Sequence, residues 1–164
     1  LLALCDAAIN IAPSLEQKRD IIQNAVDALA RMGIDNPKVA VLASAETVNE
    51  KMPESVDAAA LKEMNKKGQI TGCLIEGPIS YDLAVCAESA ATKGYDSPVA
   101  GDADLLVCPN IVTANVLIKC LRHTANALTA GIVVGGRVPV VLNSRAASAE
   151  DKFRTMVLAA SAAG

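Results

Sequence analysis

The stretch KVAVLA at residues 38–43 is apolar at every position after its lysine. A half-exposed strand would alternate apolar and polar side chains, so an unbroken run of strand length is typical of a strand buried on both faces. Similar runs occur at residues 2–5, 70–75 and 104–108. These runs predict the buried strands of a parallel sheet, with the third strand broken by Glu76-Gly77-Pro78.

Amphipathic segments separate these runs. Ser14 and Gln17 have the spacing of a capping box, apolar residues follow at steps of three and four, and Gly33 ends the pattern, which predicts a helix opening at Pro13 and Ser14. Asn110 is a favourable cap for another helix. Further helices are predicted at residues 57–67, 82–92, 111–125 and 148–162.

Two further short apolar runs lie near the end of the chain, at residues 131–134 and 138–142. Gly135-Gly136 can turn a hairpin between them, which would add one antiparallel edge to the sheet. The predicted fold is therefore α/β, a three-layer α/β/α arrangement with a mostly parallel sheet. A closed barrel needs eight strand–helix units, and this chain has only four or five.

Composition excludes several classes of protein. The formal net charge is −3 and aromatic residues make up 2% of the chain, so neither a basic nucleic-acid footprint nor a base-stacking platform is expected. No apolar run approaches the roughly 20 residues that a membrane helix needs. The chain opens at Leu1 inside an apolar run, and we therefore expect it to be part of a longer protein.

The five cysteines form no C-x-x-C pair, and His123 is the single histidine. A zinc site is not expected from this pattern, and no other metal site is predicted. An odd number of cysteines with apolar neighbours is typical of reduced, buried thiols in a cytoplasmic protein.

The usual nucleotide and hydrolase motifs are absent. No G-x-G-x-x-G follows a strand, and neither a Walker A sequence nor a G-x-S-x-G elbow occurs. In open parallel sheets ligands collect beyond the carboxyl ends of the strands, so the segments that follow the strands are the places to search.

Residues 143–151, which read NSRAASAED, combine a hydroxyl, a guanidinium and carboxylates at the start of a predicted helix. Arg145 offers bidentate recognition of phosphate or carboxylate, and the helix end favours anions. Ser148 and Asp151 also have capping-box spacing, so from spacing alone a purely structural role remains the favoured alternative.

Two other segments are candidates for substrate binding. Gly77 and Pro78 predict a tight turn at a strand end, with Asp82 at the next helix start, although a turn and a favourable helix dipole explain the same residues. Asn115 and Lys119 lie four apart on one helix face, where they could bond a substrate and meet phosphate. For Lys119 an exposed polar face is the preferred explanation.

Several short motifs of this sequence together resemble the phosphate acetyltransferase and phosphate butyryltransferase family. Their residues are closer to those of the butyryltransferase branch. The resemblance runs in order along nearly the whole chain. Its motifs are NIAPSLEQK at residues 10–18, VAVL at 39–42, EGP at 76–78, GDAD at 101–104, Pro109 with Asn115, and Ser144-Arg145.

The resemblance implies transfer of an acyl group between coenzyme A and inorganic phosphate, with no permanently bound cofactor. It also implies a fold similar to the isocitrate and isopropylmalate dehydrogenases, with two α/β/α domains around a cleft. Residues 1–141 would be the second domain and residues 142–164 a segment returning to an absent first domain. Because the family also takes phosphate-binding arginines from that first domain, this chain alone is expected to be inactive.

The resemblance also assigns roles. Arg145 would bind phosphate and stabilise charge on the carbonyl oxygen, and Ser144 would orient the thiol or the phosphate. Asp151 would be the general base, with Glu150 as a competitor. The expected assembly is a cytoplasmic homodimer or higher homo-oligomer that uses acyl-CoA and phosphate and binds neither nucleic acid nor membrane.

Two other functions remain open at this point. One is a metal-dependent decarboxylating dehydrogenase of the same shape, for which Asp102 and Asp104 are close in sequence but lack a third ligand. The other is a non-catalytic module that binds coenzyme A or assembles with a partner.

Overall fold

The predicted parallel sheet is present in the computed structural model, which describes residues 1–163. Its four strands lie in the order β1 (Ala3–Cys5), β4 (Leu105–Val107), β2 (Lys38–Leu42) and β3 (Leu74–Ile79), and every neighbouring pair is parallel. The α/β class and the parallel sheet predicted from the apolar runs are confirmed.

Strand β2 lies inside the sheet and is buried on both faces, as its sequence predicts. Val39 and Val41 belong to one core cluster, whereas Ala40 and Leu42 belong to a second one on the opposite face. The alternation follows from the strand itself, because successive side chains point to opposite faces of a sheet. One strand thus contributes to both halves of the core.

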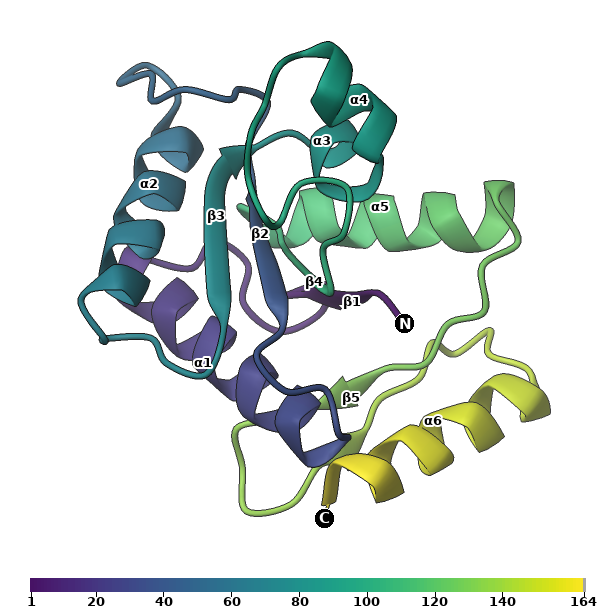
Figure 1. Ribbon diagram of the computed structural model, residues 1–164. Helices are drawn as coiled ribbons and strands as arrows, with labels where there is room; N and C mark the ends of the chain where they lie inside the picture. Colours follow the sequence, from purple (N-terminus) through teal and green to yellow (C-terminus); the bar gives the residue numbers. More distant parts are fainter. Residues whose placement is uncertain (164) are drawn as a thin grey trace.

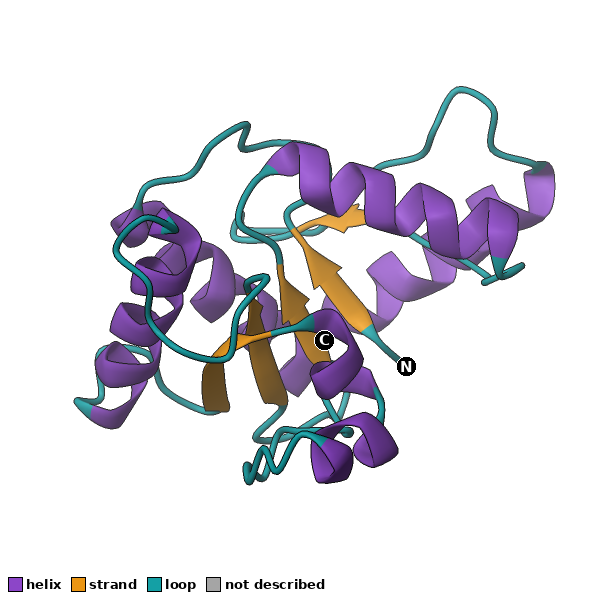
Figure 2. Ribbon diagram, turned by 90° about the horizontal axis from the view of Figure 1, so that it is seen from above, coloured by secondary structure: helices purple, strands orange, loops and turns teal. Residues whose placement is uncertain are grey.

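Helices cover both faces of the sheet (Figures 1 and 2). The first core cluster includes residues from α1 (Leu15–Arg31) and α2 (Pro53–Lys66). The second includes residues from α3 (Tyr81–Val85), α4 (Ala87–Thr92) and α5 (Ile111–Thr124). Three layers result, with the sheet in the middle.

The start of α1 has the capping box that the sequence predicts. The backbone N–H of Gln17 donates to Ser14 Oγ at 3.3 Å, and the N–H of Ser14 donates to Gln17 Oε1 at 2.8 Å. Asn110 caps α5 with its side chain alone, by accepting from the N–H of Thr113 at 3.0 Å. Two orphan donors at the start of α1 are therefore satisfied locally.

The third strand is shifted from its predicted position. It begins at Leu74 and runs through Glu76, Gly77 and Pro78 instead of ending before them. Pro78 fits because β3 is the outer strand, where a residue without an N–H leaves no partner unpaired. Helix α2 likewise begins at Pro53 and not at Asp57, since proline is well suited to a first helical turn.

The helix predicted at residues 82–92 is interrupted at Cys86, whose backbone is extended. Two backbone carbonyls of α3 accept hydrogen bonds from the loop that precedes β4. The N–H of Gly101 donates to Leu83 O at 2.7 Å, and the N–H of Ala103 donates to Ala84 O at 3.2 Å. These tertiary bonds replace the next helical turn, so the chain continues as a separate helix, α4.

The outer edge of β3 is closed by side chains. Asn65 accepts from the N–H of Ile75 at 3.3 Å and donates to the carbonyl of Cys73 at 3.1 Å. The carboxylate of Glu76 accepts from the N–H of Gly77 at 3.0 Å. The Tyr95 hydroxyl donates to the carbonyl of Pro78 at 3.1 Å.

The last two strands form the predicted hairpin, but not an edge of the main sheet. Strands β5 (Ile132–Val133) and β6 (Val140–Val141) pair antiparallel as a separate two-stranded sheet. They pack against α6 (Ala149–Ala163), which also contacts α1 (Figure 1). None of the helices within residues 1–163 is long and apolar enough to cross a membrane.

Candidate active site

Ser144 and Arg145 lie on an exposed turn between β6 and α6. The N–H of Ala147 donates to the carbonyl of Ser144 at 3.0 Å, which defines the turn. Arg145 is exposed, and its guanidinium takes part in none of the ion pairs formed among the described residues. Its donors are therefore available to an anion.

Both ends of this turn are fixed to α6. Before it, Asn143 Oδ1 accepts from the hydroxyl of Thr155 at 3.0 Å, and Thr155 is fully buried. After it, Ser148 and Asp151 form a capping box, in which Ser148 N–H donates to Asp151 Oδ2 at 2.9 Å and Asp151 N–H donates to Ser148 Oγ at 3.1 Å. The segment 143–148 is thus attached to the first two turns of α6; it is called the phosphate loop below, after the phosphate binding that the sequence analysis expects of Arg145.

Both carboxylate oxygens of Asp151 are engaged. Oδ2 accepts from Arg122 Nη2 at 2.6 Å as well as from Ser148, and Oδ1 accepts from Arg154 Nη1 at 3.3 Å. The backbone N–H and hydroxyl of Ser148, together with Arg122, lower the pKa of Asp151 to about 2. Glu150 is exposed and pairs with Arg154. The general-base role of Asp151 stays a prediction, and a carboxylate with so low a pKa is a weak proton acceptor at neutral pH.

The lowered pKa of Asp151 predicts an acid sensitivity. Because the folded-state pKa lies below the ordinary value of 3.8, the carboxylate stabilises the fold above that value and loses this contribution as pH falls toward about 2. Melting temperatures measured between pH 6 and pH 2 should fall less steeply in Asp151→Asn than in the unmodified protein. Glu150→Gln is the control and should keep the steep fall. Identical profiles for Asp151→Asn and the unmodified protein would contradict the assignment.

Gly77 and Pro78 do not form the predicted turn at a strand end, since both lie within β3, whereas Asp82 lies in the first turn of α3, as predicted. A Cβ at Gly77 would lie 3.0 Å from Val41 Cβ, so this glycine permits close packing of β3 and β2. Asp82 accepts from Ser80 Oγ at 2.7 Å and pairs with Lys93 at 3.0 Å. Each residue has a structural role, and their proposed role in substrate binding is untested.

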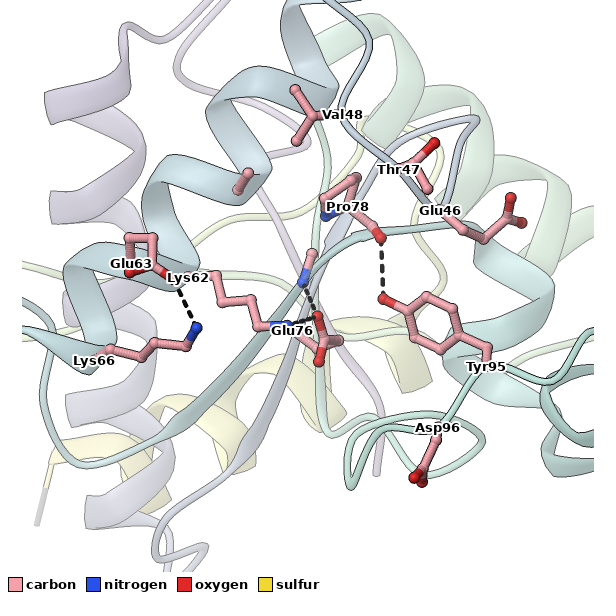
Figure 3. A pocket seen from close by; sticks show the side chains of 12 residues that line it. Glu46, Thr47, Val48, Lys62, Glu63, Lys66, Glu76, Pro78, Tyr95 and Asp96 are labelled. Carbon is pink, nitrogen blue, oxygen red and sulfur yellow. Dashed lines mark hydrogen bonds and ion pairs between the residues drawn. The ribbon is translucent and has the colours of Figure 1, made fainter.

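A cavity of about 460 Å³ opens beside Gly77 and Pro78 (Figure 3). Its two lysines are already paired, Lys62 with Glu76 at 2.5 Å and Lys66 with Glu63 at 2.6 Å. Burial raises the pKa of the Glu76 carboxyl, but the hydrogen bonds from Lys62, Ser97 and Gly77 outweigh burial and hold the pKa below its ordinary value. With Glu46 and Asp96 also on its wall, the cavity carries excess negative charge, which disfavours phosphate groups.

Asn115 and Lys119 lie on α5, as the sequence predicts. The Asn115 amide donates to the carbonyl of Ala7 at 3.1 Å and so holds the loop that follows β1. Lys119 is exposed. Among the described residues, no hydrogen bond or ion pair joins these two side chains to the phosphate loop or to Asp82.

Two residues with clear structural roles were not predicted from sequence. Asp6 accepts from the backbone N–H groups of Ala8, Ile9 and Asn10; burial raises its pKa, but these bonds outweigh burial and lower it. An Asp directly after a strand is a known turn signal and could have found it. Arg122 had no such signal, because its partner Asp151 is distant in sequence.

Comparison with known proteins decides the family. A family model described as "Phosphate acetyl/butaryl transferase" matches residues 1–160. The chain belongs to this family. The resemblance noted in the sequence is thereby confirmed.

Relatives in this phosphate acetyl/butyryltransferase family are similar over nearly the entire chain. A phosphate acetyltransferase of Rhizobium meliloti is 48% identical over 97% of this chain and 50% of its own length. A phosphate butyryltransferase of Clostridium acetobutylicum is 46% identical over 100% of this chain and 54% of its own. The chain therefore spans about half the length of the curated relatives it matches.

A solved structure is also closely similar to this chain. A branched-chain phosphotransacylase from Enterococcus faecalis V583 superposes with a TM-score of 0.92 at 40% identity, covering 98% of this chain and 57% of that one. The match includes the separate β5–β6 sheet and α6, since so little of the chain lies outside it.

Proposed function

We propose that this chain is part of a phosphate acyltransferase, which converts a short-chain acyl-CoA and inorganic phosphate to acyl phosphate and free coenzyme A. The observation that carries the proposal is the phosphate loop, in which an unpaired, exposed Arg145 stands on a turn fixed at both ends. Relatives of 46–48% identity that are named phosphate acetyltransferase and phosphate butyryltransferase support the same reaction.

In the proposed mechanism, phosphate and acyl-CoA are held together and react directly. A phosphate oxygen forms a bond to the acyl carbonyl carbon, and the carbon–sulfur bond breaks with its electron pair leaving on the thiolate. Arg145 holds the phosphate through two parallel N–H donors and stabilises the charge that develops on the carbonyl oxygen. Ser144 orients the thiol or the phosphate. Holding both reactants in contact supplies much of the rate.

Asp151 has two roles to be distinguished within this mechanism. In acyl phosphate synthesis the sulfur leaves as a thiolate and needs no base; there Asp151 holds the phosphate loop and, if it accepts the thiol proton in the reverse direction, returns that proton to the departing sulfur. In the reverse direction the thiol must lose a proton, and the family resemblance makes Asp151 its acceptor. A base role for Asp151 in deprotonating the thiol would give a pH–rate profile for the reverse reaction whose acid limb follows the pKa of Asp151.

We further propose that residues 142–164 return to a first domain, in the two-domain arrangement of the isocitrate dehydrogenase-like fold. Phe153, Met156 and Val157 of α6 are large apolar side chains that are half or more exposed. An unpartnered apolar face of this kind is expected where another domain packs. The five unpaired cysteines support a reducing, cytoplasmic location, and a homo-oligomer is proposed from the family alone.

Thiol release from acetyl-CoA and butyryl-CoA in the presence of phosphate tests this function. Both the complete gene product and this 164-residue chain should be assayed. We expect release only from the complete product, because further phosphate ligands are proposed to come from the first domain. No release from the complete product would favour a binding module, and reduction of a nicotinamide with a hydroxy acid would favour a dehydrogenase.

A further inference from the structure

The junction between α5 and α6 depends on one arginine. Among the residues of α5, Ala114 alone is fully buried, and Leu117 packs partly buried against the same core cluster. At its last turn, Arg122 reaches across to a different part of the fold. Its side chain is 29% exposed and that of Asp151 is 11% exposed, which places their ion pair largely out of solvent.

The guanidinium of Arg122 bonds two separate segments of the chain. Nη1 donates to Thr129 Oγ1 at 3.2 Å, in the segment that leads to β5, and Nη2 donates to Asp151 Oδ2 at 2.6 Å. The planar guanidinium fixes the direction of both donors at once, which a lysine ammonium cannot do. Arg122 therefore sets the first turn of α6 relative to both α5 and the β5–β6 sheet.

Asp151 is in turn bonded to Ser148, three residues after Arg145. The oxygen that accepts from Arg122 also accepts from the N–H and the hydroxyl of Ser148, the residue that ends the phosphate loop. Ser148 lies three positions after Arg145, and the intervening turn is closed by the bond from Ala147 to Ser144. A shift of Asp151 would therefore be passed along this short turn to the Arg145 guanidinium.

We propose that Arg122 is a positioning residue for Arg145, acting through Asp151 and Ser148 to hold the phosphate loop in its binding geometry. This inference rests on the proposed acyl transfer. In it, Asp151 is the anchor of the loop, and Arg122 does not touch substrate.

The test compares Arg122→Met and Arg122→Lys in the complete gene product by steady-state kinetics with butyryl-CoA and phosphate. A misplacement of about 1 Å can cost about 100-fold in rate, so kcat/KM for phosphate should fall by about that factor in Arg122→Met. KM for butyryl-CoA should stay within about twofold, and Arg122→Lys should recover part of the loss because an ammonium can still bond Asp151.

Arg154→Met is the matched control. Arg154 also bonds Asp151, but both residues lie on α6, so its loss leaves the link between α5 and α6 intact. In this variant kcat/KM for phosphate should fall by no more than about threefold. That loss is much smaller than the roughly 100-fold loss expected when a reacting group is misplaced. Wild-type kinetics in Arg122→Met, or an equal loss in Arg154→Met, would overturn the inference.

Hydrogen exchange of residues 143–148 provides a readout that does not depend on activity. Arg122→Met should speed amide exchange in this segment, and Arg122→Lys should do so less. Unchanged exchange would overturn the positioning role. An inactive unmodified protein in which exchange still responds to Arg122→Met would instead refute the acyl-transfer function and leave the structural link standing.

Discussion

Replacing Arg145 with alanine in the complete gene product is expected to lower kcat by about 100- to 1,000-fold, the usual effect of removing one group that stabilises a developing oxyanion. Arg145 is the exposed guanidinium of the phosphate loop and pairs with no described carboxylate, so its donors are available to the phosphate. Initial rates of thiol release over a range of phosphate concentrations would measure the loss. Arg145→Lys should recover only part of it, because an ammonium lacks the bidentate geometry.

Arg137→Ala is the appropriate control for this experiment. Arg137 is also exposed and lies between β5 and β6, in the turn of the hairpin. Its replacement changes the net charge by the same amount and should leave kcat within about twofold, since screened charges outside the site contribute little. Turnover of Arg145→Ala close to that of Arg137→Ala would refute the catalytic role of Arg145.

Gly101→Ala should destabilise the fold by about 3 kcal/mol or more, the sum of a left-handed backbone cost and an overpacking cost. Gly101 has φ of +75°, and a Cβ there would lie 2.5 Å from Ala87 Cα and 2.6 Å from Ala87 N. The obstacle is backbone at the start of α4, which cannot turn aside as a side chain could. Urea unfolding of the complete gene product would measure the change in the free energy of unfolding.

Gly94→Ala separates the cost of the left-handed backbone from the cost of overpacking. Gly94 has φ of +63°, but nothing lies within 4 Å of the position of its Cβ. This variant should therefore lose only the backbone cost, about 1 kcal/mol. Equal losses at the two positions would show that the close approach to Ala87 does not matter. The comparison also gives a physical reason for the glycine in the GDAD motif, which no residue with a Cβ could replace without moving α4.

The features that could be predicted from sequence are those that depend on residues close together in the chain. The strand at residues 38–43 is buried on both faces, and the caps at Ser14 and Asn110 form as expected. These features depend on residues within a few positions of one another, where backbone geometry alone fixes the outcome. The family resemblance rested on several such short motifs in order, and it too was confirmed.

The features that could not be predicted depend on distant contacts. The interruption at Cys86 follows from bonds that Gly101 and Ala103 make to α3, and Pro78 is accommodated because β3 has no neighbour on its outer side. The candidate site shows the same division. The capping box of Ser148 and Asp151 could be predicted from spacing, whereas the ion pair of Asp151 with Arg122 joins two helices that no sequence periodicity relates.

The closed edge of β3 has a consequence for association. An outer strand normally presents free N–H and C=O groups onto which a strand from another molecule can add, the first step of aggregation and of many domain swaps. Here Asn65, Glu76 and Tyr95 already occupy those groups, and Pro78 has no N–H to offer. Addition of a further strand at this edge is therefore disfavoured, because several of its backbone groups are already bonded within the chain.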